Sequence, residues 1–68
     1  MHERLNNRLR EERAQRHLTQ ADLAMLVGVS RKTINTVENG VFIPSTVLAL
    51  RLARALDTSV ESLFQLPE

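Results

Sequence analysis

The chain has no cysteine, tryptophan or tyrosine, and only two residues each of phenylalanine, glycine and proline. Without cysteine, neither a disulfide nor a thiolate metal site can supplement the core, and the composition favours a reducing cytoplasm. A domain of about this length buries only about 60% of the surface that its unfolded chain exposes. We therefore expect residues 1–68 to form one small domain with a small core.

The shortage of aromatic side chains and of long apolar runs excludes further classes of partner. Two phenylalanines leave little on which unpaired bases could stack, which argues against a binder of single strands or RNA loops. No run approaches the ~18 apolar residues of a membrane helix, and the charged N-terminus has no apolar stretch behind it, as a secretory signal would. We expect no membrane partner.

The charge is nearly balanced but unevenly distributed. The net charge is +1, and residues 1–40 carry seven of the nine cationic side chains and five of the eight acidic ones. Such a protein would not coat nucleic acid indiscriminately, so an anionic partner should meet the N-terminal half.

Helix-capping signals divide the chain. Leu5 and Leu9 share one face of a first helix, and Thr19 with Asp22 predicts a capping box, with Leu18 as its hydrophobic staple. We expect helices over residues 5–15, 20–27, 31–39, 46–56 and 60–66, the last three capped by Ser30, Ser45 and Ser59 and the second ended by Gly28. Because no segment alternates with period two, the predicted fold class is all-α, without strands.

Catalytic chemistry has little support. The two histidines, His2 and His17, are 15 positions apart and have no cysteine beside them, so solvated side chains explain them better than a metal site. The serines fall at helix starts, where capping accounts for them, and there is no glycine-rich phosphate loop. The prediction is no enzyme, no metal or other cofactor, and no small-molecule ligand.

The third expected helix has one apolar side and one polar side. At 100° per residue, Ile34 and Val37 fall on the buried side, and Arg31 lies at the leading end of the helix. The opposite side carries Lys32, Asn35, Thr36 and Asn39. These side chains can bond base edges in the major groove of DNA. The alternative is an ordinary solvent-exposed face.

The stretch "TQADLAMLVGVSRKTINTVENG" resembles the Cro/phage-repressor helix-turn-helix family, also called the xenobiotic-response-element type. Ala24, Gly28, Ile34 and Val37 occupy the family's expected places, and "PS" and "ALRLARAL" match further along the chain. The resemblance covers about Leu5 to Phe64. It implies a compact five-helix, lambda-repressor-like domain with its helix-turn-helix at about residues 20–39, and core and dimerisation helices at about 45–66.

The resemblance also implies roles for matching residues. The base-reading residues would be Arg31, Lys32 and Thr36, with Asn35 as a possible contributor. The phosphate-binding groups would be Gln20, Asn39 and the backbone N–H groups around Val41, Ser45 and Thr46.

A structural ion pair between Arg13 and Glu38 is implied as well. The residues themselves favour it, because Glu38 lies on the core side of a helix that approaches a polyanion and needs a cation beside it. The alternative is that Glu38 points into solvent.

Three positions depart from the family pattern. His17 stands where relatives usually have the glycine that ends the first helix, so this turn should be strained or reshaped. Glu12 occupies a place that is often apolar, which should loosen the contact of the first helix. Ser62 replaces the acidic residue that would complete a capping box with Ser59.

The chain has more apolar residues than a small core can cover, and the candidates for a dimer interface are Ile43, Val47, Leu50 and Leu66. Two copies with recognition helices ~34 Å apart would meet successive major grooves of an inverted repeat. We predict a homodimeric transcriptional regulator that binds double-stranded DNA sequence-specifically and represses transcription by occluding promoters. It would act in the cytoplasm of a prokaryote or phage host, at the nucleoid. The alternative is a protein-interaction module or antitoxin-like partner, which would lack the steep salt dependence of DNA binding.

Overall fold

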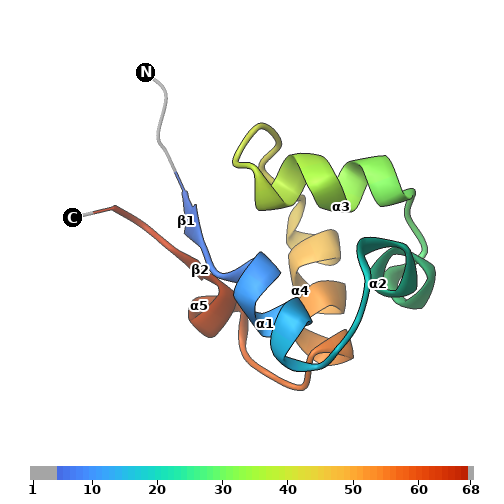
Figure 1. The fold of residues 1–68 in the computed structure, drawn as a ribbon. Helices are drawn as coiled ribbons and strands as arrows, with labels where there is room; N and C mark the ends of the chain where they lie inside the picture. The colour runs from blue at the N-terminus through green and yellow to red at the C-terminus, as the bar shows by residue number, and fades with distance from the viewer. Residues whose placement is uncertain (1–4, 68) are drawn as a thin grey trace.

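The computed structural model describes residues 5–67, which form five helices and one small sheet. Figure 1 shows α4 (Thr46–Ala55) in the middle of the molecule, with α3 (Arg31–Glu38) running across one end of it and α2 (Gln20–Val27) beside it. The remaining helices are α1 (Leu9–Gln15) and α5 (Val60–Leu63). Helix α4 packs against α2 and α5, and α3 packs against α1 and α2. This arrangement is the five-helix fold that the resemblance implied.

Every helix contributes to one apolar core. The side chains that lose essentially all contact with solvent are Leu9, Leu23, Ile34, Val37, Leu52, Leu56 and Leu63. Two of the seven, Ile34 and Val37, come from α3, so burial of one side of this helix fixes which side faces outward.

The predicted starts of α2, α3, α4 and α5 are confirmed. The Thr19 hydroxyl accepts from the backbone N–H of Asp22, and the Asp22 carboxylate accepts from the N–H of Thr19, which completes the capping box. Ser30, Ser45 and Ser59 each cap their helices with the hydroxyl group. Gly28 ends α2 with φ of +78°, a left-handed angle that glycine adopts without strain.

The expectation that the chain has no strands was wrong. Asn6–Asn7 (β1) pairs antiparallel with Phe64–Gln65 (β2), with Asn6 opposite Gln65 and Asn7 opposite Phe64. A ladder of two residues per strand has no alternating pattern that a sequence could reveal. The sheet is a minor part of a helical fold, and the all-α class holds.

This small sheet also explains why two helices are shorter than predicted. Helix α1 begins at Leu9 rather than Leu5, because the preceding residues pair with β2, and the Asn7 side chain accepts from the N–H of Leu9 at 3.3 Å. Helix α5 ends at Leu63 rather than Leu66, because Phe64 turns to extended backbone to pair with β1.

The three departures from the family pattern have separate outcomes. His17 keeps the left-handed angle of the glycine it replaces, with φ of +58°, so the turn is strained and not reshaped. Glu12 is half-buried, and its carboxylate accepts from Arg16 at 3.0 Å. The Ser59 hydroxyl donates to the Ser62 hydroxyl at 2.8 Å, which differs from a capping box, where the third residue accepts from the backbone N–H of the capping residue.

One ion pair joins α1 to α3. Arg13 Nε lies 2.6 Å from Glu38 Oε2, and Arg13 Nη2 donates to Glu38 Oε1 at 3.2 Å, so the two residues paired in the sequence analysis meet in a bidentate contact. Arg13 Nη1 donates to the Leu18 carbonyl at 2.7 Å. The Glu38 side chain has no solvent exposure. A single guanidinium therefore holds α1, the α1–α2 turn and α3 together.

The surroundings of Glu38 keep it ionised. Burial raises the pKa of its carboxyl group, but hydrogen bonds from Arg13 and Gln20, the charge of Arg13 and a bond from Arg10 outweigh burial. The net result is a pKa below the ordinary value for glutamate. The bond to Glu38 raises the pKa of Arg13 in turn.

We expect Arg13→Met to lower the free energy of unfolding by about 3 kcal/mol at neutral pH, because it leaves a buried carboxylate without its main partner. The pair stabilises the folded state fully above pH ~4.3, the ordinary pKa of glutamate, and this stabilisation is lost as pH falls through the lower pKa of the folded state. The difference in free energy of unfolding between wild type and Arg13→Met should therefore become smaller in acid. Urea melts at pH ~7 and ~3 measure it.

Arg51→Met is the matched control for this experiment, because Arg51 is an exposed arginine on α4 and has no acidic partner among residues 5–67. It should change stability by less than about 0.5 kcal/mol at both pH values. A gap between wild type and Arg13→Met that stays constant with pH would contradict the assignment to Glu38.

We expect His17→Gly to raise the free energy of unfolding by about 0.5–1 kcal/mol, because glycine relieves the strain of the left-handed backbone angle. Part of this stabilisation is offset, because glycine also raises the conformational entropy of the unfolded chain. His17→Ala keeps the Cβ atom and should leave stability nearly unchanged. Thermal melts compare the two. Equal stabilisation by both variants would mean that the imidazole, and not the backbone angle, is unfavourable.

Candidate nucleic-acid interface

The outward side of α3 is set by how the helix is held. Ser30 caps its start after the Gly28 turn, and Ile34 and Val37 are buried beneath it. The residues left exposed on or directly after the helix are Arg31, Lys32, Asn35 and Asn39. A guanidinium, an amine and two amides thus share a surface that the core holds in one orientation.

Gln20, at the start of α2, joins this surface to the core ion pair. Its Nε2 donates to Asn35 Oδ1 and to Glu38 Oε1, both at 3.1 Å. Its Oε1 accepts from Arg31 Nη1 at 3.3 Å. Both donors of the Gln20 amide are therefore engaged, and two of the predicted base-reading side chains are held by one glutamine.

Thr36 differs from the other predicted base-reading residues. It is half-buried, and its hydroxyl donates to the Thr33 carbonyl at 2.9 Å. The hydroxyl proton is used within the helix. Thr36 therefore offers its methyl group and oxygen lone pairs, rather than a donor, to a ligand.

The predicted phosphate-binding positions lie at the ends of helices, and one of them needs correction. Ser45 and Thr46 are exposed at the start of α4, where unpaired N–H groups and the helix dipole favour anions. The backbone N–H of Val41 instead donates to the Thr36 carbonyl at 3.0 Å. It is therefore not available to a phosphate, and the assignment of Val41 as a phosphate-binding group was wrong.

Arg10 belongs to this surface and was missed by sequence reasoning. Its Nη2 donates to Asn39 Oδ1 at 2.6 Å, and its Nε lies 3.3 Å from Glu38 Oε1. Its side chain is 56% exposed, so charge remains available to an anion. The sequence feature that indicates its role is the spacing of three residues between Arg10 and Arg13, which places both side chains on one side of α1.

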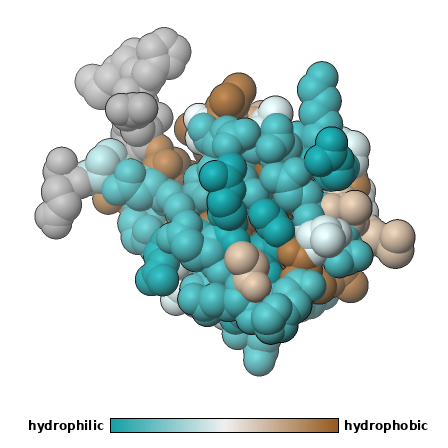
Figure 2. Space-filling view, in the orientation of Figure 1, coloured by the Kyte–Doolittle hydropathy of each residue, from teal (hydrophilic) through white to brown (hydrophobic). Residues whose placement is uncertain are grey.

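The charges around α3 favour an anionic partner. Two arginines, Arg10 and Arg13, face the single carboxylate of Glu38, which leaves an excess of positive charge. Among residues 5–67, the arginine and lysine side chains with no acidic partner within 4.0 Å are Arg31, Lys32, Arg51 and Arg54. The first two lie on α3. In the view of Figure 1 the molecular surface is mostly hydrophilic, with few hydrophobic side chains interrupting it (Figure 2).

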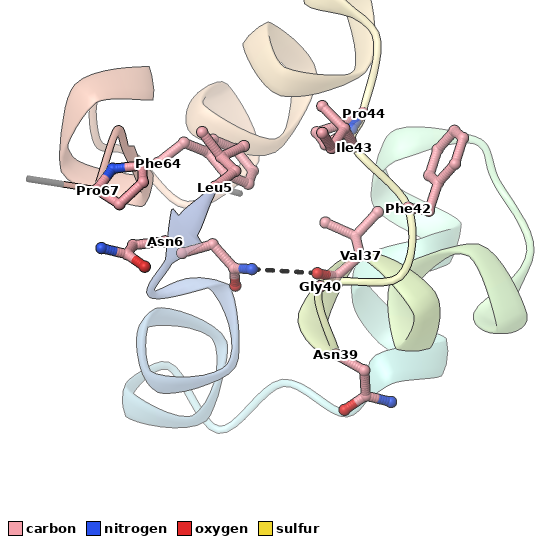
Figure 3. A pocket seen from close by; sticks show the side chains of 11 residues that line it. Leu5, Asn6, Val37, Asn39, Gly40, Phe42, Ile43, Pro44, Phe64 and Pro67 are labelled. Atoms are coloured by element: carbon pink, nitrogen blue, oxygen red, sulfur yellow. Dashed lines mark hydrogen bonds between the residues drawn. The ribbon is translucent and has the colours of Figure 1, made fainter. Parts of the chain in front are cut away.

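A groove separates β1 from the chain that follows α3 (Figure 3). Leu5, Phe64 and Pro67 line one side of it, and Phe42, Ile43 and Pro44 line the other. The dashed bond in Figure 3 runs from Asn7 Nδ2 to the Val37 carbonyl at 3.2 Å. Asn7 thereby satisfies a carbonyl at the C-terminal end of α3 and attaches the small sheet to this helix.

The four predicted dimer-interface residues are all exposed, and they are Ile43 (57%), Val47 (57%), Leu50 (56%) and Leu66 (69%). Leu50 and Leu66 line one apolar groove together with Val60 and Phe64. Ile43 lines the adjoining groove of Figure 3, and Val47 lies one helical turn from Leu50. These side chains lie near one another at α4 and the C-terminal segment.

Within the described chain, no group of three or more histidine, cysteine, aspartate or glutamate side chains could hold a metal ion. No helix within residues 5–67 is long and apolar enough to cross a membrane.

Known proteins share this arrangement along most of the chain. The helix-turn-helix family model matches residues 9–63. A helix-turn-helix-type transcriptional regulator of Methanocaldococcus jannaschii is 42% identical over 60 residues, which cover 88% of this chain and 91% of that protein. The restriction-modification controller protein C.AhdI of Aeromonas hydrophila has 43% identity and a TM-score of 0.78, over 82% of this chain and 85% of that one.

Several of the similar structures belong to an enzyme. Hydroxypropylphosphonic acid epoxidase from S. wedmorenis matches 84% of this chain with 31% identity and a TM-score of 0.77, but only 30% of its own length is covered. The fold thus also occurs as a minor part of a larger catalyst, whereas the relatives of similar length are transcriptional regulators. With its family match spanning α1 to α5, the chain belongs to the Cro/phage-repressor-type helix-turn-helix family of transcriptional regulators.

Proposed function

We propose that this protein binds an inverted-repeat operator in double-stranded DNA as a homodimer, with α3 of each copy in the major groove, and represses transcription by occluding a promoter. The observation that carries the proposal is the exposed set of Arg31, Lys32 and Asn35 on one side of a helix whose other side is buried. Arginine or lysine with guanine, and asparagine with adenine, are the common pairings of base readout.

Groups around α3 would hold the DNA backbone in the same complex. Arg10 and Asn39 form a bonded pair beside the helix, and Ser45 and Thr46 stand at the N-terminus of α4. Gln20 positions Arg31 and Asn35, and its amide would donate to a phosphate only in place of its bond to Asn35 or Glu38. Contacts of this kind fix register without carrying sequence information. Such a protein would act at the nucleoid, in the cytoplasm.

The test is selection from a random duplex library. Wild type should enrich an inverted repeat, and a variant with Arg31, Lys32 and Asn35 all changed to Ala should not. Arg31→Ala alone should lower affinity by about 1–3 kcal/mol and relax preference at one base pair of each half-site.

The matched control is the double variant Arg51→Ala, Arg54→Ala. It lowers the net charge by the same two units, from +1 to −1, at exposed residues of α4. It should still enrich the repeat. If the folded wild type enriches no sequence, α3 has only a solvent-exposed face, and the protein-interaction alternative is favoured.

Dimerisation has a separate test. Leu50→Glu should give a monomer in sedimentation at tens of micromolar and lose the preference for an inverted repeat over a single half-site, because it places a charge in the proposed apolar contact. Leu26→Glu makes the same change at a leucine of similar exposure on α2 (61% against 56%) and should remain dimeric. A monomeric wild type at this concentration would count against the proposal.

A further inference from the structure

A shallow apolar concavity lies beside the base-reading residues of α3. Its lining comes from Lys32, Thr33 and Thr36 on the helix and from Val41 and Phe42 in the loop that follows. Val41 is 78% exposed and Phe42 is 46% exposed, so neither is part of the core. This loop therefore presents apolar surface next to the side chains that are proposed to enter the major groove.

Backbone hydrogen bonds hold the loop against the helix. The N–H groups of Val41 and Phe42 both donate to the Thr36 carbonyl, at 3.0 and 3.2 Å. The walls of the concavity are therefore held together without a ligand, and a bound group would meet them with little ordering of the backbone.

The lining of the concavity combines apolar side chains with one cationic side chain, Lys32. Because the Thr36 hydroxyl donates its proton to the Thr33 carbonyl, the methyl group and the oxygen lone pairs of Thr36 remain for contact. Val41, Phe42 and the methylene stem of Lys32 add further apolar surface. The ammonium group at the end of the Lys32 stem stays in solvent, as long cationic side chains generally do.

Thymine matches this combination. Of the four bases, only thymine presents an apolar group, its C5-methyl, in the major groove, and the acceptor O4 lies beside that methyl. We propose that the concavity receives the C5-methyl group of one thymine in each half-site, with the Lys32 ammonium facing O4. This inference rests on the proposed function and adds to it a base preference set by apolar contact.

Replacing thymine with deoxyuridine tests the proposal, because it removes the methyl group and leaves the hydrogen-bonding edge unchanged. In the operator selected by the wild type, each thymine is replaced in turn, symmetrically in both half-sites. Burial of one methyl is worth about 0.8 kcal/mol, which is a fourfold change in affinity per half-site and about 15-fold for both. We expect such a loss of affinity at one thymine position of each half-site, and we expect this loss to depend on the side chain of Val41.

The variant Val41→Thr replaces one methyl with a hydroxyl at nearly constant shape, and it should reduce the deoxyuridine effect at that position to less than about twofold per half-site. Met25→Thr alters an apolar side chain that is 83% exposed on α2, away from the concavity, and should keep the full effect. Circular dichroism melts show whether both variants fold.

Three results would overturn the inference while leaving the proposed function intact. The first is an operator in which no thymine is sensitive to replacement by deoxyuridine. The second is an equal effect of deoxyuridine on the affinities of wild type and Val41→Thr. The third is loss of the dimer in Val41→Thr, which would make the loop a contact between subunits. Failure of the wild type to select any sequence would instead overturn the proposed function, and this inference with it.

Discussion

The buried ion pair between Arg13 and Glu38 is the interaction on which the outward surface of α3 depends. Glu38 has no solvent exposure and lies on a helix that also carries Arg31 and Lys32. Unpaired, its charge would be costly to bury and would oppose an anionic partner. The guanidinium of Arg13 removes both difficulties and bonds the Leu18 carbonyl as well. The electrostatic balance of the surface and the packing of three chain segments therefore rest on one side chain.

Gln20 connects this ion pair to the exposed side chains of α3. The same Glu38 oxygen, Oε1, accepts from Arg10, Arg13 and Gln20, and Gln20 in turn bonds Asn35 and Arg31. Long polar side chains lose conformational entropy when they bind a ligand. Holding Arg31 and Asn35 before binding would lower that cost in the proposed complex with DNA.

Local signals in the sequence predicted the starts of α2 to α5 and the orientation of α3, because a cap such as Ser30 and a buried pair such as Ile34 and Val37 act within a few residues of each other. The pairing of Asn6–Asn7 with Phe64–Gln65 could not be predicted, since its partners are nearly 60 positions apart and carry no strand pattern. The role of Arg10 and the occupied N–H of Val41 depend likewise on distances between elements.

The same fold occurs within an epoxidase, and a fold by itself does not specify a function. The residues that build the apolar core, such as Leu23, Ile34 and Leu52, would serve any function of the scaffold.

What is free to differ is the side of α3 that the core does not use, together with the loop after it. In this chain that region combines two cations, an exposed amide and an apolar concavity around Thr36 and Val41. Cations that meet only phosphates would favour any DNA, because phosphates are alike in every sequence, whereas a cation, an amide or a methyl group that meets a base edge distinguishes bases. The sequence specificity proposed for this regulator should therefore depend on which side chains of α3 meet base edges, and not on the net charge of the protein.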